Sequence, residues 1–346
     1  MRPLSHTEAE TYQRCSYKHY LRYELGLRPR VMAAKVEVGA WVHSLLEAYY
    51  TALKNSADPA KAVDQMHRQL LDEKWNVLFD EEKDLLNQDV QSGYELPDLA
   101  YQIAKRYIER YRKEDQAQWK KILLVEKEIT VKPEWMARPF TFRCDLVVLD
   151  KHGWVRIYDH KVVKTMPDEE SRVLDPQGAR YVLAMHEFLR RKGVKVHGIT
   201  MVYDYIRDRL PAEPALLKSG KGLSKQWIDT EPDVYLDAIK RNGFDPSEYE
   251  DILDRLRREG KPYFDRWAVP KSDVRLAYEK KLLAYLSVVT KSKSEFCPRT
   301  LDRIRCTFDC EFKEICLTEL EGGDAQQIIK EKFEVVGDEA RRQRAG

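Results

Sequence analysis

The sequence has no run of 18 consecutive apolar residues, so it predicts no membrane-spanning helix. Its first 20 residues, MRPLSHTEAETYQRCSYKHY, lack the apolar centre of a secretory signal. The formal net charge is only +2, which excludes a histone-like polycation but still allows a local basic groove. The pattern G-x-x-x-x-G-K-[ST] is absent, which excludes a P-loop motor. Together these absences predict an intracellular protein in a reducing compartment.

Cysteine is present but unevenly placed. Six cysteines stand at positions 15, 144, 297, 306, 310 and 316, and four of them lie in the last 50 residues. A lone buried cysteine behaves as a small apolar side chain, and this is our interpretation of Cys144. The pattern C-x3-C-x5-C from Cys306 to Cys316 is typical of a metal site, because disulfides are rare in a reducing compartment.

The pattern of apolar residues predicts a small α/β core between helical flanks. The chain has 346 residues, 43% of them hydrophobic, which suffices for a sizeable core. Thr7 and Glu10 form a capping-box pattern at the start of a predicted helix over 7–27. Further helices are predicted over 38–54, 60–120 with a turn near Gly93, 175–193 and 231–290. Strands are predicted over 121–132, 138–150, 154–165 and 194–206, and a loop is predicted over 210–225.

Residues 157–165 read IYDHKVVKT and place two charged side chains on one face of a strand. Because side chains alternate along a strand, Asp159 and Lys161 point to one side and His160 to the other. On the preceding strand Asp145 is predicted to face away from Phe142, Cys144, Leu146 and Val148. A hairpin would then bring Asp145 near Asp159. Two carboxylates and a lysine suit Mg²⁺ or Mn²⁺ and the stabilisation of negative charge, whereas a simple edge-strand salt bridge is the alternative.

Glu126 and Glu128 lie on the first predicted strand of the core. We interpret both as residues of a solvated strand edge and leave them out of the catalytic set.

Four short motifs follow one another in a recognisable order. They are GAWVH with His43, FRCDLVV with Asp145, DHK with Asp159 and Lys161, and QGARY with Gln177 and Tyr181. In this order the chain resembles the PD-(D/E)XK nucleases. The resemblance is to the RecB-like branch, which includes the AddB nuclease domain and the CRISPR-associated iron–sulfur nuclease of spacer acquisition.

The resemblance implies a role for each motif residue. His43, Asp145 and Asp159 would hold a catalytic Mg²⁺ or Mn²⁺, with the backbone carbonyl of His160 as a further ligand. Lys161 would be the catalytic lysine. Gln177 and Tyr181, on the helix that follows, would contact DNA or support the catalytic set.

The resemblance also implies a fold. It is an α/β, restriction-endonuclease-like core, a mixed sheet flanked by helices, with helical N- and C-terminal regions joined by a cysteine-ligated metal cluster. The expected parts are an N-terminal segment (1–35), a helical region with the motif histidine (36–120), the nuclease core (121–209), a helical insertion (210–290), a cysteine segment (291–320) and a polar tail (321–346).

The cysteines offer two ligand sets. RecB-like nucleases with clusters use one cysteine before the nuclease core and three after it, which implies a [4Fe–4S] cluster on Cys15, Cys306, Cys310 and Cys316. The helix predicted over 7–27 would carry Cys15. The alternative is a local Zn²⁺ site that uses Cys297 in place of Cys15.

Aromatic and basic residues interleave near the N-terminus and over 101–121. Such segments suit single-stranded DNA, and we expect Arg28 and Arg30 to contact it. The resemblance implies the same contact for Tyr181. The predicted function is a metal-dependent DNA exonuclease acting at single-stranded ends in recombination, repair, phage or CRISPR DNA processing. A structure-specific endonuclease and a non-cleaving iron–sulfur DNA-binding module are the alternatives. The expected location is the cytoplasm of a prokaryotic or phage-infected cell, with recombination or replication proteins left open as partners.

Overall fold

The computed structural model describes residues 2–30, 36–78, 82–84, 95–269, 272–291 and 296–336. The turn predicted near Gly93 and the last part of the predicted polar tail, 337–346, lie outside these residues. Within the described ranges, no helix has the length and apolar character needed to cross a bilayer.

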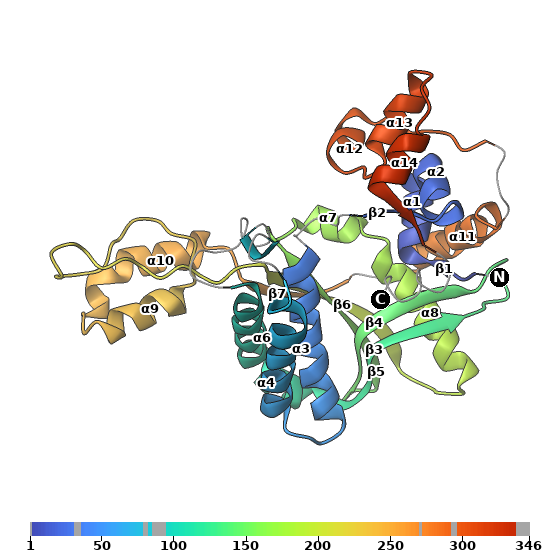
Figure 1. Cartoon of the computed structure of the whole chain (residues 1–346). Helices are drawn as coiled ribbons and strands as arrows, with labels where there is room; N and C mark the ends of the chain where they lie inside the picture. The colour runs from blue at the N-terminus through green and yellow to red at the C-terminus, as the bar shows by residue number, and fades with distance from the viewer. Residues whose placement is uncertain are drawn as a thin grey trace.

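A mixed sheet forms the centre of the molecule (Figure 1). In the described part of the chain it has six strands: β1 (Leu4–Ser5), β3 (Trp119–Val131), β4 (Phe140–Asp150), β5 (Trp154–Val163), β6 (Gly198–Arg207) and β7 (Phe264–Ala268). The order is β1-β4-β5-β6-β7, and β3 also pairs with β4. The pairs β1/β4 and β5/β6 are parallel and the others antiparallel. The prediction of a mixed sheet is therefore confirmed, but β7 lies in a stretch that we predicted to be helical.

The connections around β5 follow the sequence signals. The predicted turn between β4 and β5 is present, and Gly153 adopts a left-handed φ of 81° there. After β5 the chain forms α7 (Glu169–Leu174) and α8 (Gln177–Arg191) before it returns as β6. The Asp175 side chain accepts a hydrogen bond from the Gln177 backbone N–H, which fixes the start of α8. The parallel strands β5 and β6 need such a crossover connection, which here places the amino end of α8 next to β5.

Helices cover both faces of the sheet (Figure 1). On one face lie α3 (Val36–Lys54), α4 (Pro59–Leu70), the π-helical turn η2 (Leu71–Trp75) and α6 (Leu96–Gln118), which share a buried cluster with the sheet. On the other face lie α8 and α11 (Asp273–Val289), together with a residue of the first helix, around a second buried cluster. We call these the α3 side and the α8 side of the sheet.

Strands β3 and β4 change sides part-way along their length. Phe142 and Cys144 belong to the buried cluster on the α8 side, but Leu146 and Val148 belong to the cluster on the α3 side. Our prediction that these four residues share one face is therefore wrong. The physical reason is a local irregularity in the neighbouring strand, where Glu126 has a left-handed φ of 41°. The reversal lies at Asp145 and Glu126, so the side chains of these two acids do not follow the regular alternation between the two sides of the sheet.

The first helical segment is broken at Cys15. We predicted one helix over 7–27 that would carry Cys15, and this is wrong. The structure has α1 (His6–Arg14), α2 (Ser16–His19) and the π-helical turn η1 (Tyr20–Glu24), with Cys15 in an extended conformation between the first two. Ser5, not Thr7, caps α1, because its side chain accepts the backbone N–H of Glu8.

The two end regions of the chain form one structural unit, which we call the terminal module (residues 15–29 and 296–336). Strand β2 (Leu27–Pro29) pairs antiparallel with β8 (Phe333–Val335). The helices α12 (Arg303–Phe308), α13 (Lys313–Leu320) and α14 (Gln326–Lys332) lie beside α2 (Figure 1). Leu21 and Leu27 from the first region bury against Phe312, Ile315 and Phe333 from the last. Residues 326–335, which the sequence suggested to be a polar tail, are therefore part of a folded unit.

Residues 208–263 form an arm that projects from the sheet between β6 and β7 (Figure 1). Its helices are α9 (Pro232–Arg241), the 3₁₀ turn η3 (Pro246–Tyr249) and α10 (Glu250–Glu259), and they have a small apolar cluster of their own. The base of the arm is fixed to the rest of the protein by ion pairs of Arg207 with Asp229 and of Arg106 with Glu231.

Candidate active site

The four sequence motifs meet at the point where β3 and β4 change sides. His43 comes from α3, Asp145 from β4, Asp159 and Lys161 from β5, and Gln177 from the first turn of α8. The antiparallel register of β4 and β5 ends with Leu146 opposite Tyr158, and Asp145 and Asp159 are the residues next to this last pair. Residues that are more than 100 positions apart in the sequence, such as His43 and Asp159, thus contribute to one site.

Asp159, Lys161 and Gln177 form a closed set of contacts. The Lys161 Nζ lies 2.8 Å from Asp159 Oδ2 and donates a hydrogen bond of 2.7 Å to Gln177 Oε1. The Gln177 amide nitrogen donates to Asp159 Oδ1 at 2.8 Å. Burial lowers the pKa of Lys161, but Asp159 and Asp175 together raise it by more, so the net shift of the pKa is upward. Gln177 therefore orients the acid and the lysine together.

A second group brings together two histidines and one acid. Among the described residues, His43, Asp145 and His160 each offer one ligand atom, and these atoms lie within 4.8 Å of one another. The Nδ1 atoms of His43 and His160 are each 3.7 Å from Asp145 Oδ2. Asp145 Oδ2 also accepts the backbone N–H of His160 at 2.7 Å. Asp159 does not belong to this group in the present arrangement, since its two oxygens face Lys161 and Gln177.

Glu126 belongs to the site, although we interpreted it as a solvated edge residue. That interpretation is wrong, because its side chain is only 6% exposed and its Oε1 lies 3.6 Å from His43 Nδ1. Arg143 donates from Nε to Glu126 Oε2 at 2.8 Å and holds the acid in place. Glu128 is exposed, as predicted. The left-handed backbone at Glu126 turns this one acid of the strand inward.

The charges of the site favour a bound cation. Burial raises the pKa of Asp145, and the neighbouring carboxylates of Asp159 and Glu126 raise it further while His43 opposes them. Burial lowers the pKa of His43, but Glu126 and Asp145 raise it by more. The carboxylates of Glu126 and Asp145 lie 3.6 and 3.7 Å from the Nδ1 atom of His43, and hard divalent cations accept such a donor set. The residues present therefore fit a divalent metal ion.

The imidazole of His160 is buried on the α3 side of the sheet. It stacks on Tyr50 with ring centroids 5.7 Å apart, and its Nε2 lies 3.6 Å from Asp204 Oδ2. Burial lowers its pKa well below the usual value, so the ring is neutral. Asp204 in turn accepts hydrogen bonds from Tyr107 and Arg266. This buried network fixes the strand segment that carries Asp159 and Lys161.

The residues expected to contact DNA have other partners in this structure. Tyr181 is 8% exposed and its ring packs on Phe142 at 5.3 Å, which favours a supporting role over contact with DNA. Arg28 donates to the backbone carbonyls of Arg22 and Leu27. Arg30 donates to the carbonyl of Lys330. Both arginines thus stabilise the terminal module, and their contact with DNA stays a prediction.

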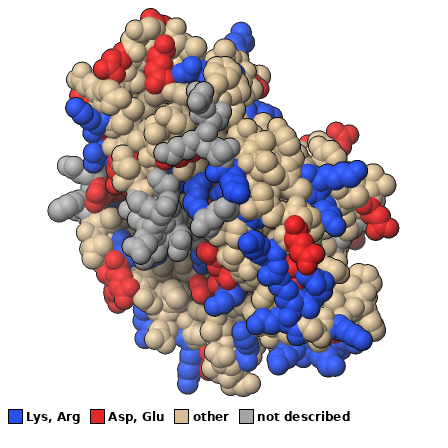
Figure 2. All heavy atoms as spheres, turned by 90° about the vertical axis from the view of Figure 1, so that its right-hand side faces the viewer, with Lys and Arg blue, Asp and Glu red and all other residues tan. Residues whose placement is uncertain are grey.

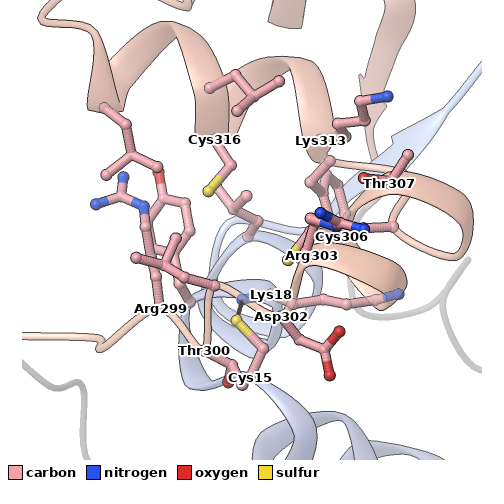
Figure 3. Close-up of a pocket in the computed structure, with 17 residues that line it drawn as sticks. Cys15, Lys18, Arg299, Thr300, Asp302, Arg303, Cys306, Thr307, Lys313 and Cys316 are labelled. Carbon is pink, nitrogen blue, oxygen red and sulfur yellow. Dashed lines mark hydrogen bonds between the residues drawn. The ribbon is translucent and has the colours of Figure 1, made fainter.

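Four cysteines line a single cavity in the terminal module (Figure 3). The cavity has a volume of about 300 Å³, and Cys15, Cys306, Cys310 and Cys316 contribute to its wall. In Figure 3 the thiols of Cys15 and Cys316 point into it from opposite sides. Cys297 is not part of its lining. Cys144 is buried in the core, as predicted. These four cysteines are those of the predicted set that includes Cys15, and their role as ligands stays a prediction.

The model of a family described as the PD-(D/E)XK nuclease superfamily matches residues 3–317. A crystal structure of a "Putative exonuclease" from Eubacterium rectale has a TM-score of 0.44 and 11% sequence identity, and covers 93% of this chain and 94% of its own. Among curated proteins, none matches.

Proposed function

The chain belongs to the PD-(D/E)XK nuclease superfamily, and we propose that it is a metal-dependent deoxyribonuclease that degrades DNA from a single-stranded end. The observation that carries this proposal is the convergence of Asp145, Asp159 and Lys161 with His43 at one point of the sheet. These are the residues that phosphodiester hydrolysis requires: ligands for a cation and a fixed positive charge.

Each side chain of the site would have a separate role in hydrolysis. Glu126, Asp145, Asp159 and His43 would hold the divalent ion, which when bound supplies a nucleophilic water and neutralises phosphate charge. Lys161, whose ammonium lies 2.8 Å from Asp159, would act through its positive charge. Gln177 orients Lys161 and Asp159 through its two amide atoms. Because Lys161 is 26% exposed, its ammonium remains accessible to a substrate phosphate.

Charge on the surface supports a nucleic-acid substrate. Figure 2 shows Lys and Arg side chains gathered over the lower part of one face of the molecule. At the carboxyl end of α8, Arg190, Arg191, Lys192 and Lys195 are all exposed. Such clusters attract the phosphate backbone even in a chain whose net charge is close to zero.

A [4Fe–4S] cluster on Cys15, Cys306, Cys310 and Cys316 is part of the proposal. Zinc with Zn–S bonds of about 2.3 Å needs sulfur atoms about 4 Å apart. Among the described residues, no three cysteines bring their sulfur atoms within 4.8 Å of one another. The spread of these thiols around a cavity of about 300 Å³ therefore favours a larger group than a single ion. Iron and acid-labile sulfide analysis of anaerobically purified protein tests this, and stoichiometric zinc without iron would contradict it.

The nuclease proposal is tested with end-labelled single-stranded and duplex DNA in Mg²⁺, Mn²⁺ and EDTA. We expect release of short products from linear single strands in either metal and none in EDTA. Lys161→Ala and Asp159→Ala should each abolish cleavage while DNA binding persists. A circular single strand should stay intact, because an exonuclease needs an end. Cleavage of the circle would indicate an endonuclease, and absence of any cleavage would indicate a non-cleaving binding module.

A further inference from the structure

A cavity of about 250 Å³ lies where the arm joins the carboxyl edge of the sheet. It is lined by Thr165, Met166, Arg207, Trp227, Ile228, Asp229, Thr230, Glu259, Gly260 and Lys261. Its volume is slightly below the range of about 300–1,000 Å³ that is typical of pockets for drug-sized ligands. The cavity therefore suits one planar ring system and not a larger molecule.

Trp227 gives the cavity an aromatic surface. Its side chain is 43% exposed, which is unusual for the largest apolar residue. The Arg255 guanidinium lies 4.7 Å from the centre of the Trp227 ring. Its Nε atom forms an ion pair of 2.9 Å with Glu259 Oε2. An exposed indole backed by a fixed guanidinium is the kind of platform on which unpaired bases stack in single-strand binding proteins.

The charges that line the cavity largely cancel. Arg207 makes two hydrogen bonds of 2.7 and 2.6 Å to the two carboxylate oxygens of Asp229. Glu259 is paired with Arg255. Lys261 adds one exposed cation. A lining in which charges are paired suits an uncharged heterocycle better than a phosphate, while Lys261 can neutralise the phosphate attached to it.

Thr230 supplies an independent indication of a ligand. It is only 2% exposed, and its Oγ1 is buried without a hydrogen-bond partner among the described residues. A buried hydroxyl without a partner is unfavourable, and such groups call for a specific explanation. Thr230 lines the cavity, but its Oγ1 has almost no exposed surface as placed, so rotation about χ1 is needed to turn the hydroxyl toward a base, whose edge carries both donors and acceptors.

The cavity lies at the same edge of the sheet as the catalytic residues. Strands β5 and β6 are parallel, and Thr165 and Arg207 stand at their carboxyl ends. Thr165 follows Lys161 by only four residues in the chain. Ligands of open α/β sheets bind outside the carboxyl ends of the strands. A nucleotide in the cavity would thus lie on the same side of the molecule as the phosphate that is cleaved.

We propose that this cavity binds an unpaired base of the DNA strand, stacked on Trp227, and so selects single-stranded substrate. This role rests on the proposed nuclease function. It makes the cavity the site that distinguishes an unpaired base from a paired one. A paired base cannot enter, because its hydrogen-bonding edge and one stacking face are already engaged in the duplex. The arm is then an element for substrate selection and Trp227 a specificity-determining residue.

The test measures DNA binding in EDTA, so that it does not depend on cleavage. Trp227→Ala should weaken binding of a fluorescent single-stranded 20-mer by roughly 5- to 150-fold, which corresponds to the loss of stacking on one base at about 1–3 kcal/mol. Binding of a blunt duplex should stay within about twofold, since no unpaired base is available. Trp227→Phe should restore most of the single-strand affinity. The matched control is Trp154→Ala at the amino end of β5, which is also 43% exposed and should bind like wild type.

A second variant separates a binding role from a structural one. Thr230→Val keeps the shape and removes the buried hydroxyl without a partner, so its melting temperature should equal or exceed that of wild type while its single-strand affinity falls. Unchanged affinity in both Trp227→Ala and Thr230→Val would overturn the inference even if the protein is a nuclease. Failure of the wild-type protein to cleave DNA in any metal would instead refute the proposed function.

Discussion

The buried ion pair between Glu8 and Arg138 connects the N-terminal segment to the sheet, and its removal should be costly. The Arg138 side chain is 3% exposed and donates from Nη1 to Glu8 Oε1 at 3.0 Å and to the Thr290 carbonyl at 2.8 Å. The same Glu8 Oε1 lies 2.7 Å from Arg2 Nη2 and 3.1 Å from His19 Nε2. The Glu8 carboxylate thus joins α1, α2 and the segment before β4, and Arg138 extends the contact to the end of α11.

The expected size of the effect follows from this burial. Arg138→Met leaves Glu8 in an apolar environment with one arginine fewer, and breaking a buried pair in this way costs about 3–5 kcal/mol in the free energy of unfolding. Glu8→Gln leaves the guanidinium of Arg138 without its counter-ion and should cost a similar amount. Because each single variant leaves an uncompensated charge, the double variant should be more stable than the sum of the two losses predicts.

The pH dependence provides a second measurement. Burial raises the pKa of Glu8, but the contact with His19 and the charges of Arg138 and Arg2 outweigh it, so the folded-state pKa lies below the usual value of 4.5. A carboxyl with a lowered pKa stabilises the folded state at pH values above about 4.5. That stabilisation is lost as the pH falls through the folded-state pKa. The difference in stability between wild type and Glu8→Gln should therefore be largest at neutral pH and shrink in acid.

Urea unfolding of the four proteins at pH 7 and at pH 4 measures both effects. A control is Arg190→Met, whose side chain is 56% exposed and pairs with Glu187 at the surface. It should cost at most about 1 kcal/mol. If the two single losses at Glu8 and Arg138 simply add, with a coupling below about 0.5 kcal/mol, the two residues do not act as a pair and the reasoning is refuted.

Three further predictions concern the site and the cysteines. Glu126→Gln should raise the Mg²⁺ concentration needed for half-maximal cleavage by roughly tenfold, whereas Glu128→Gln on the same strand should not; equal metal titrations would remove Glu126 from the metal site. Gln177→Leu should lower kcat by roughly 10- to 100-fold with little change in KM, because the amide orients both Lys161 and Asp159; an unchanged kcat would contradict this role. Cys15→Ser should abolish the absorbance near roughly 400 nm that is expected of an iron–sulfur protein and lower the melting temperature, while Cys297→Ser should do neither; colour that survives in Cys15→Ser would exclude Cys15 as a ligand.

The sequence predicted the elements whose signals are local and strong. The acid–histidine–lysine triplet at the end of β5, the Asp175 signal before α8 and the turn at Gly153 are all in place. The mixed sheet, which the resemblance to the nucleases implied, was also confirmed, and β5 and β6 are one of its parallel pairs. The resemblance also placed His43 with Asp145, and His43 Nδ1 lies 3.7 Å from Asp145 Oδ2.

The errors have physical causes that a pattern of alternating residues cannot reveal. Glu126 was missed because a single left-handed residue changes which side of the sheet the following side chains face. The break at Cys15 was missed because the residues around it all tolerate a helix, and tertiary contacts decide the break. Strand β7 was missed because it has only five residues, and its pairing partner β6 precedes it by a whole inserted arm.

The pairing of β2 with β8 has a consequence for how the protein is made. Leu27 and Phe333 share a buried cluster, but 306 positions separate them in the sequence. At a synthesis rate of about 5–20 residues per second, Leu27 leaves the ribosome roughly 15–60 s before Phe333. During that interval Leu21 and Leu27 have no native apolar partner from the C-terminal region. The nascent chain therefore carries an exposed apolar segment through most of its synthesis, at a stage when association with a chaperone would prevent aggregation.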